Sequence, residues 1–270
     1  MFNAKDLVAF SDRHKREENQ DRSFYMSMDG SPDINAKMVI LAVLDGVSHS
    51  NGGDAAPMAA AAMRPHLAEL LGKADQLLLL DDQTKRAEIH QALKRAILSA
   101  DAHLYRQQCG GLEYGTTITL AVAFDEAIFT ANVGDSPAYL FRLSPDGQSG
   151  KLLPMFECHN EAGLLVRKGV MTPEEALNSR SKNIIMRMVG SPGLMEDEIY
   201  TAFAWMSQSD VLLLGSDGAL SVFPEETLAN LICQHIHKGL PAVVAALFEK
   251  VQSSPSTDNF TVLAQWLETD

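Results

Sequence analysis

Five aspartates stand directly before or after segments that are typical of β-strands, three of them beside glycine and one beside asparagine. They are Asp21, Asp45, Asp135, Asp217 and Asp258. This placement predicts carboxylates that converge at one edge of a sheet assembly. Carboxylate oxygens are hard ligands that suit Mg²⁺ or Mn²⁺, and the sequence has no Cys/His cluster of the zinc-binding kind. Two divalent ions held by shared carboxylates would activate a water molecule and bind phosphate oxygens.

The stretch around Asp45 shows the pattern most clearly. Residues 39–44 form a continuous apolar run that is too short for a helix and rich in β-formers, which predicts a strand covered on both faces. Asp45 then stands at a strand end, and Gly46 allows the backbone carbonyl to come close to an ion. Taken alone, this Asp-Gly pair is more often only a turn. The motif recurs, however, because the apolar residues 211–214 lead into a second Asp-Gly pair at Asp217.

Hydrophobic periodicity predicts a chain of mixed strands and helices. Strands are expected at residues 23–28, 39–44, 117–123, 128–133, 138–143, 151–155, 184–189, 199–205, 211–214 and 260–267. Helices are expected at residues 55–71, 83–108, 159–168, from 172 onward, 224–237 and 240–251. The first two strands should pair as an antiparallel hairpin with a long loop. Residues 159–178 read as a helical insertion between strands.

Composition and charge narrow the class of protein. A chain of 270 residues with 46% hydrophobic composition can bury a substantial core. No linker, repeat or low-complexity tract divides it, and the strand-end aspartates come from both halves, so we expect residues 1–270 to form one domain. The net charge of −13 argues against a general binder of nucleic acid or anionic membranes.

The cysteines and the N-terminal residues indicate the cellular compartment of the protein. Cys109, Cys158 and Cys233 are odd in number, far apart and not in CxxC spacing, which is typical of a reducing compartment. The N-terminal residues have no apolar signal core, and no segment approaches the length needed to cross a bilayer. We therefore expect a cytoplasmic monomer that does not associate with membranes.

Seven segments, taken in order, give the sequence a specific resemblance. They are SDRHKREENQD, VLDGV, YGTT, NVGDSPAYL, GVMTPEEA followed by NIIMRMVG, LLLGSDGAL and TDNFTV. Together they resemble the metal-dependent serine/threonine phosphatases of the PPM (PP2C-like) class, in their bacterial form. Each segment alone is a weak signal, but seven in family-like order and spacing are specific.

The resemblance implies both a fold and a reaction. The fold is α+β, a PP2C-like four-layer sandwich of two central antiparallel β-sheets flanked by α-helices. The reaction is single-step hydrolysis of phosphoserine or phosphothreonine on proteins by a hydroxide bridging two Mn²⁺ or Mg²⁺ ions, without a covalent phosphoenzyme. The implied partners are phosphorylated proteins, the substrates of a bacterial Ser/Thr kinase.

The family's metal centre is carried over residue by residue. Asp45 matches the carboxylate that bridges both ions, and the carbonyl of Gly46 matches a ligand of the second ion. Asp217 and Asp258 match ligands of the first ion. Asp21 matches the carboxylate that orients metal-bound water.

Two further positions match functional residues of the family. Asp135 matches the carboxylate associated with a third, weaker metal in bacterial members. Arg16, five residues before Asp21, matches the arginine that binds substrate phosphate, which a guanidinium can do with two hydrogen bonds. Residues 159–178 match the flap beside the site, where members vary in substrate selection.

The sequence departs from the family pattern near these positions. Gln20 stands where the family often has Glu, and Val47-Ser48 replaces the usual glycine pair. Val47 also occupies the place of a histidine proposed as general acid in some relatives. His49 is a nearby candidate for that role, although a lone loop histidine is more often only solvated. Pro137 and Asn178-Ser179 replace a common Arg and a His-Pro pair.

These departures keep two alternatives open. One is a phosphatase-like regulatory or partner-binding module whose altered loops have weakened or abolished turnover. The other is a metal-dependent hydrolase of small phosphoesters. Both would keep the same five aspartates, so the sequence alone does not separate them from a protein phosphatase.

Overall fold

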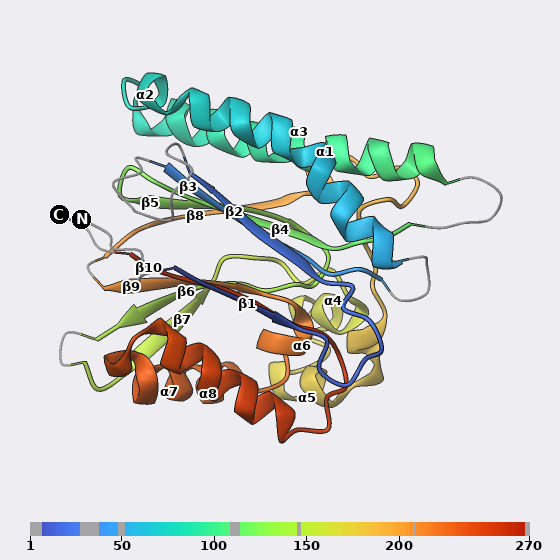
Figure 1. Ribbon diagram of the computed structural model, residues 1–270, viewed down its shortest axis with the longest axis vertical. Coiled ribbons are helices and arrows are strands. Elements are labelled where there is room, and N and C mark those ends of the chain that lie inside the picture. Colours follow the sequence, from blue (N-terminus) through green and yellow to red (C-terminus); the bar gives the residue numbers. More distant parts are fainter. Residues whose placement is uncertain are drawn as a thin grey trace.

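Two five-stranded antiparallel sheets lie face to face, with helices on their outer faces (Figure 1). The computed structural model describes residues 7–27, 38–47, 52–108, 114–144, 147–207 and 209–267. One sheet contains, in spatial order, β2 (Arg22–Ser27), β3 (Met38–Leu44), β4 (Ile118–Phe124), β5 (Ala127–Val133) and β8 (Tyr200–Trp205). The other contains β1 (Leu7–Asp12), β10 (Phe260–Leu267), β9 (Asp210–Gly215), β6 (Ala138–Leu143) and β7 (Gly150–Pro154). The expected α+β sandwich is confirmed.

The helices form two outer layers and a group at one end of the sandwich (Figure 1). The layer over the first sheet consists of α1 (Gly52–Gly72), α2 (Ala74–Leu77) and α3 (Asp82–Gln107), and the layer over the second consists of α7 (Glu225–His235) and α8 (Leu240–Gln252). The end group contains α4 (Glu161–Arg167), α5 (Pro173–Asn178) and α6 (Asp217–Leu220). Short 3₁₀ turns are η2 (Arg180–Asn183), η3 (Glu196–Glu198) and η4 (Ile236–Lys238). None of the helices in the described ranges is long and apolar enough to cross a membrane.

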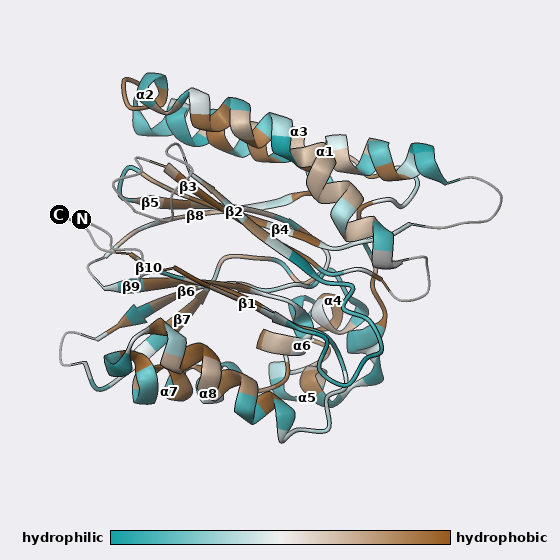
Figure 2. Ribbon diagram, in the orientation of Figure 1, coloured by the Kyte–Doolittle hydropathy of each residue, from teal (hydrophilic) through white to brown (hydrophobic). Residues whose placement is uncertain are grey.

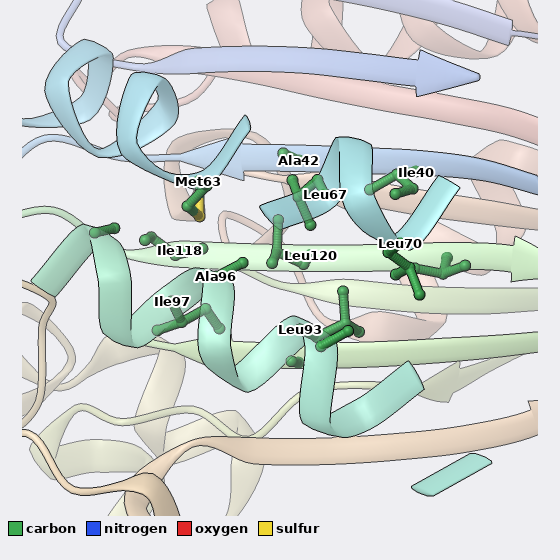
Figure 3. Close-up of a cluster of buried hydrophobic side chains, with 14 of the residues drawn as sticks. Ile40, Ala42, Met63, Leu67, Leu70, Leu93, Ala96, Ile97, Ile118 and Leu120 are labelled. Carbon is green, nitrogen blue, oxygen red and sulfur yellow. The ribbon is translucent and has the colours of Figure 1, made fainter. Parts of the chain in front are cut away.

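Strand β3 is buried on both faces, as its unbroken apolar run predicts. Alternate residues point to opposite sides of a strand. Ile40 and Ala42 pack with Leu67 of α1 in the layer between sheet and helices (Figure 3). Leu41 and Val43 pack in the layer between the two sheets. The strand that ends at Asp45 is therefore held by two hydrophobic layers at once.

The end of the sandwich that carries α4, α5 and α6 is also its polar end. Figure 2 shows hydrophobic residues along the strands and a hydrophilic connection between β1 and β2, residues 13–21, that lies beside these helices. The connection from β9 to α6 reaches the same end (Figure 1). Chain segments far apart in the sequence thus meet where the strands stop.

The predicted strand at residues 184–189 is wrong. The structure has only isolated bridges there, Asn160 with Ile185 and Thr116 with Val189. Because the two bridges lead to different partners, no continuous ladder forms. Ile184 and Met186 are 49% and 54% exposed, and of this run it is Val189, at 0% exposure, that enters the core.

The packing of β3 gives a stability prediction. Leu41 is fully buried between the sheets, so Leu41→Ala should lower the free energy of unfolding by roughly 2–5 kcal/mol through lost burial and a residual cavity. Leu79→Ala is the matched control, because Leu79 is 86% exposed and its truncation should change stability by less than about 0.5 kcal/mol. Urea unfolding of both variants measures the difference. Equal losses would show that β3 is not held by the inter-sheet core.

Candidate active site

All five strand-end aspartates lie close enough to interact, since Asp21, Asp135, Asp217 and Asp258 all act on Asp45. Asp45 follows β3, and Asp217 begins α6 two residues after β9. Burial, followed by repulsion from the other four aspartates, raises the pKa of the Asp45 carboxyl group well above its ordinary value. That repulsion shows that the carboxylates lie close enough to interact. The structure therefore brings together every aspartate that the sequence singled out.

The backbone at Asp45 and Gly46 is fixed by the segment before β4. The Asp45 carbonyl accepts hydrogen bonds from the Thr117 N–H, at 2.8 Å, and from the Thr116 hydroxyl, at 2.8 Å. The Asp45 N–H donates to Thr117 Oγ1 at 3.1 Å. Gly46 forms a bridge with Thr116, and the Val47 N–H donates to the Gly115 carbonyl at 3.0 Å. These threonines position the Asp-Gly pair, a role that sequence reasoning did not assign to them.

The same segment connects Asp45 to the loop that carries Asp135. Thr117 Oγ1 lies 2.7 Å from the Ser136 hydroxyl. Gly134 has φ of +106°, and a Cβ there would lie 2.5 Å from the Thr117 Cβ, so only glycine fits. The Gly-Asp-Ser sequence is thus explained by close packing beside the site.

Asp21 is the carboxylate of the group that, among the described residues, is buried without a hydrogen bond of good geometry. It is only 2% exposed, and within the described part of the chain neither of its oxygens accepts a hydrogen bond of good geometry. Burial raises its pKa to about 6, although the nearby Thr261 and Ser216 side chains oppose that rise. A buried carboxylate without partners is costly, which marks a position where a cation would be stabilising.

Asp135, which is buried, and Asp217, which is partly buried, complete this part of the cluster. Burial and then repulsion from Asp135, Asp258 and Asp21 raise the pKa of Asp217 to about 8. Burial also raises the pKa of Asp135, and a hydrogen bond from Asn160 Nδ2 to Asp135 Oδ2, at 3.0 Å, opposes that rise. Asn160 also caps α4 through a 2.8 Å bond from the Gly163 N–H, so it links Asp135 to the flap. Sequence reasoning did not identify this asparagine.

Asp258 is already paired with Arg16. Arg16 Nη2 lies 3.1 Å from each oxygen of the Asp258 carboxylate. Arg16 is therefore at the cluster, as its sequence position predicts, but the structure shows it bound to a carboxylate. His14, in a left-handed conformation with φ of +50°, places its Nδ1 3.2 Å from the Asp258 carbonyl oxygen.

Asn259 holds the β1–β2 connection against the start of β10. Its Nδ2 donates to the carbonyls of Arg13, at 3.1 Å, and Glu18, at 2.9 Å. Its Oδ1 accepts from the Gln20 N–H at 2.9 Å. The Asp258-Asn259 dipeptide was the available sequence signal, but only the fold shows which segment the amide holds.

The structure describes some of the remaining departures from the family pattern and not others. Ser48 and His49 lie outside the described residues, as does Cys109. The Pro137 carbonyl accepts a hydrogen bond from the Gly215 N–H at 3.1 Å and so joins β6 to the end of β9. Asn178 ends α5 and donates to the Glu174 carbonyl at 3.1 Å.

The cluster fits a divalent cation in its donors and its charge. Among the described residues, no three His, Cys, Asp or Glu side chains already stand as a complete ligand set. Asp21 nevertheless offers two buried oxygens without hydrogen bonds of good geometry, and burial followed by repulsion from neighbouring aspartates raises the pKa values of Asp45 and Asp217. A cation would relieve that repulsion, and carboxylate-only donors favour Mg²⁺ or Mn²⁺. Small movements of side chains such as Asp258 would be needed to complete the ligand set.

Comparison with known proteins shows the family of this chain and agrees with its fold. The sequence model described as Protein phosphatase 2C matches residues 11–268, so the chain belongs to the protein phosphatase 2C family. The serine/threonine phosphatase stp of Listeria welshimeri is 28% identical over 254 residues, covering 93% of this chain and 90% of that protein.

Solved structures share the same architecture. The serine/threonine phosphatase Stp1 from Staphylococcus aureus superposes with a TM-score of 0.77 at 20% identity, covering 100% of this chain and 96% of that one. The catalytic domain of the phosphatase PstP, in complex with 2 manganese ions, superposes with a TM-score of 0.65 at 24% identity, covering 97% of this chain and 98% of that one. At these identities the structures establish the fold.

The Arg16–Asp258 contact gives a prediction about metal affinity. Arg16→Ala should tighten Mn²⁺ binding by about two- to fivefold, since an exposed ion pair is worth up to ~1 kcal/mol and its removal frees the Asp258 carboxylate. Arg13→Ala is the control, because it removes a charge from the same connection and, among the described residues, the Arg13 side chain donates hydrogen bonds to the carbonyls of Arg16 and Glu17 and not to a carboxylate. Isothermal titration calorimetry measures both. The same affinity change in both variants would mean that only general charge matters.

The raised pKa of Asp217 predicts an unusual pH dependence of stability in metal-free protein. Between the ordinary value of 3.8 and about 8, the folded chain binds a proton at Asp217 that the unfolded chain does not. Stability from this group therefore falls as pH rises through that window, by up to ~1.4 kcal/mol per pH unit. Asp217→Asn should be more stable than wild type above the window, and the difference should shrink as pH falls. Urea unfolding in the presence of a chelator, repeated across this pH range, measures the difference in free energy of unfolding between the two proteins. A difference that grows as pH falls would contradict the prediction.

Proposed function

We propose that the chain is a protein serine/threonine phosphatase that hydrolyses phosphoserine and phosphothreonine with the help of divalent metal ions. The observation that carries this proposal is the cluster of five interacting aspartates, with Asp21 buried and unpartnered, in a chain of the protein phosphatase 2C family. The name of the Listeria relative, a serine/threonine phosphatase, supports the substrate class.

The metal ligands follow from the residues at the polar end. Asp45 would be shared between two Mn²⁺ or Mg²⁺ ions, with the Gly46 carbonyl on one of them and Asp217 and Asp258 on the other. When bound, the ions supply an activated water molecule and neutralise charge on phosphate oxygens. Asp21 would accept a hydrogen bond from that water and orient it.

Asp135 and Arg16 lie at the margin of this arrangement. Asp135, held by Asn160, would be associated with a third and weaker ion. Arg16 would bind the substrate phosphate with two hydrogen bonds, and to do so it must leave Asp258. A cation that engages Asp258 would release the guanidinium, so we expect metal binding to favour phosphate binding.

The wider assignments rest on the same proposal. Residues 1–270 would form one PPM-type catalytic domain that acts as a monomer on phosphorylated proteins, opposing a bacterial Ser/Thr kinase. A cytoplasmic location is supported by Cys158 and Cys233, which carry thiols and not disulfides. No role in nucleic-acid or membrane binding is proposed.

One observation favours the alternative of a phosphatase-like partner-binding module. Arg16 and Asp258 satisfy each other, and such a pair would hold the site inactive if it did not open. Mn²⁺-dependent hydrolysis of p-nitrophenyl phosphate separates an enzyme from a binding module. Comparison with a phosphothreonine peptide then separates a protein phosphatase from a hydrolase of small phosphoesters.

The bridging role of Asp45 gives the sharpest test by mutation. Asp45→Asn should retain less than about a tenth of wild-type turnover, a loss above ~1.4 kcal/mol, because one missing charge disturbs both ions. Asp197→Asn, an exposed change of the same chemistry, should leave turnover unaltered. Thermal unfolding should show that both variants fold. Turnover above that limit in Asp45→Asn would remove Asp45 from the metal centre.

A further inference from the structure

A surface strip of cationic and apolar side chains, all exposed except the partly buried Lys182, runs beside the aspartate cluster. It consists of Arg180, Lys182, Ile184 and Met186, and we call it the docking strip. Ile184 is 49% exposed and Met186 is 54% exposed, so two large apolar side chains lie close together at the surface. The intervening Ile185 forms a bridge with Asn160, so the strip residues on either side of it face outward.

Backbone hydrogen bonds fix the strip next to the site. The Lys182 carbonyl accepts from Asn160 Nδ2 at 2.8 Å, and the same Nδ2 donates to the Asp135 carboxylate at 3.0 Å. The Ile184 carbonyl accepts from the Glu161 N–H at 2.9 Å. The Met186 N–H donates to the His159 carbonyl at 2.8 Å. A single side chain, Asn160, thus separates the strip from the Asp135 carboxylate.

The charge of this region is opposite to that of the whole chain. Residues 161–187 contain five basic and three acidic residues, a net charge of +2, whereas the chain carries −13. Arg167 and Arg187 are paired with Glu157 and Glu198. Across the described ranges, Arg180 and Lys182 form no ion pair with a carboxylate. Lys182 Nζ donates to the Leu177 carbonyl at 2.9 Å.

We propose that the docking strip binds the residues that flank the phosphorylated side chain of a protein substrate, and that it selects flanks in which Asp or Glu accompanies a bulky apolar residue. This proposal rests on the proposed function and specifies its substrate class. Arg180 and Lys182 supply complementary charge to acidic flanks, and Ile184 and Met186 supply an apolar surface for one side chain. Methionine suits such contacts because it is flexible and polarizable.

Contact area favours this occupant over a second copy of the chain, which at a net charge of −13 would also carry the opposite charge. Charges at the rim of a binding surface chiefly attract and select partners of opposite sign. The apolar part is too small for a stable dimer interface, since only two large apolar side chains are exposed in the strip. A substrate segment anchored at one end by its phosphate needs much less contact area.

The test compares flank preference in two charge-reversed double variants. One is Arg180→Glu with Lys182→Glu in the docking strip. The matched control is Arg106→Glu with Lys151→Glu, two exposed cations elsewhere that change the net charge equally. Each protein is assayed with Mn²⁺ on phosphothreonine peptides whose flanks carry Glu and Leu, Glu alone, or Lys and Leu. Hydrolysis of p-nitrophenyl phosphate reports on the metal site itself.

Wild type and the control should prefer the Glu-Leu peptide to the Lys-Leu peptide by about three- to tenfold in kcat/KM, the range that a few exposed ion pairs support. The strip variant should lose or reverse this preference while hydrolysing p-nitrophenyl phosphate at the wild-type rate. A separate variant, Ile184→Ser with Met186→Ser, should remove only the advantage of Leu.

Two results would overturn the proposal. If wild type hydrolyses p-nitrophenyl phosphate and all peptides without flank preference, docking fails while the proposed function stands. If wild type hydrolyses neither p-nitrophenyl phosphate nor any peptide, both the docking proposal and the proposed function are wrong. Sedimentation velocity measures the oligomeric state of wild type and the strip variants. If the strip variants change only the oligomeric state and not the flank preference, the surface binds a second copy of the chain.

Discussion

The main physical constraint on this structure is the repulsion among five carboxylates at one end of the sandwich, which the rest of the fold must offset. Burial together with this repulsion holds Asp45 and Asp217 with raised pKa values, and Asp21 is buried without a hydrogen bond of good geometry within the described chain. Such a cluster is unfavourable by itself. Its persistence requires a rigid frame and a counter-charge, and the surrounding residues supply part of each.

The frame consists of buried strands and a few polar side chains. Strand β3 is fixed by hydrophobic layers on both faces, so Asp45 leaves it at a defined position. Thr116 and Thr117 hold the Asp45 backbone, Asn160 holds Asp135, and Asn259 holds the β1–β2 connection. The partial counter-charge is Arg16, which pairs with Asp258. The favourable burial of the core thus offsets the local cost of a site arranged to receive cations.

The sequence predicted the sandwich and the identity of the clustered aspartates because both depend on local patterns: apolar runs that end in Asp-Gly, and motifs in a specific order. It did not predict the Arg16–Asp258 pair or the Asn160–Asp135 bond, because each joins residues that only the fold brings together. The strand predicted at residues 184–189 is wrong for a related reason. Apolar residues there resemble a buried strand, but their pairing partners divide between two segments and leave Ile184 and Met186 exposed.

The central claim is that the five aspartates form a centre for divalent metal ions. Crystals grown with Mn²⁺ and measured at the manganese absorption edge would locate the ions directly in an anomalous difference map. We expect two strong peaks bounded by Asp45, Asp217 and Asp258, a weaker one at Asp135, and Arg16 turned away from Asp258. A map with no peak at the cluster, or with the Arg16–Asp258 pair intact under saturating Mn²⁺, would contradict the account.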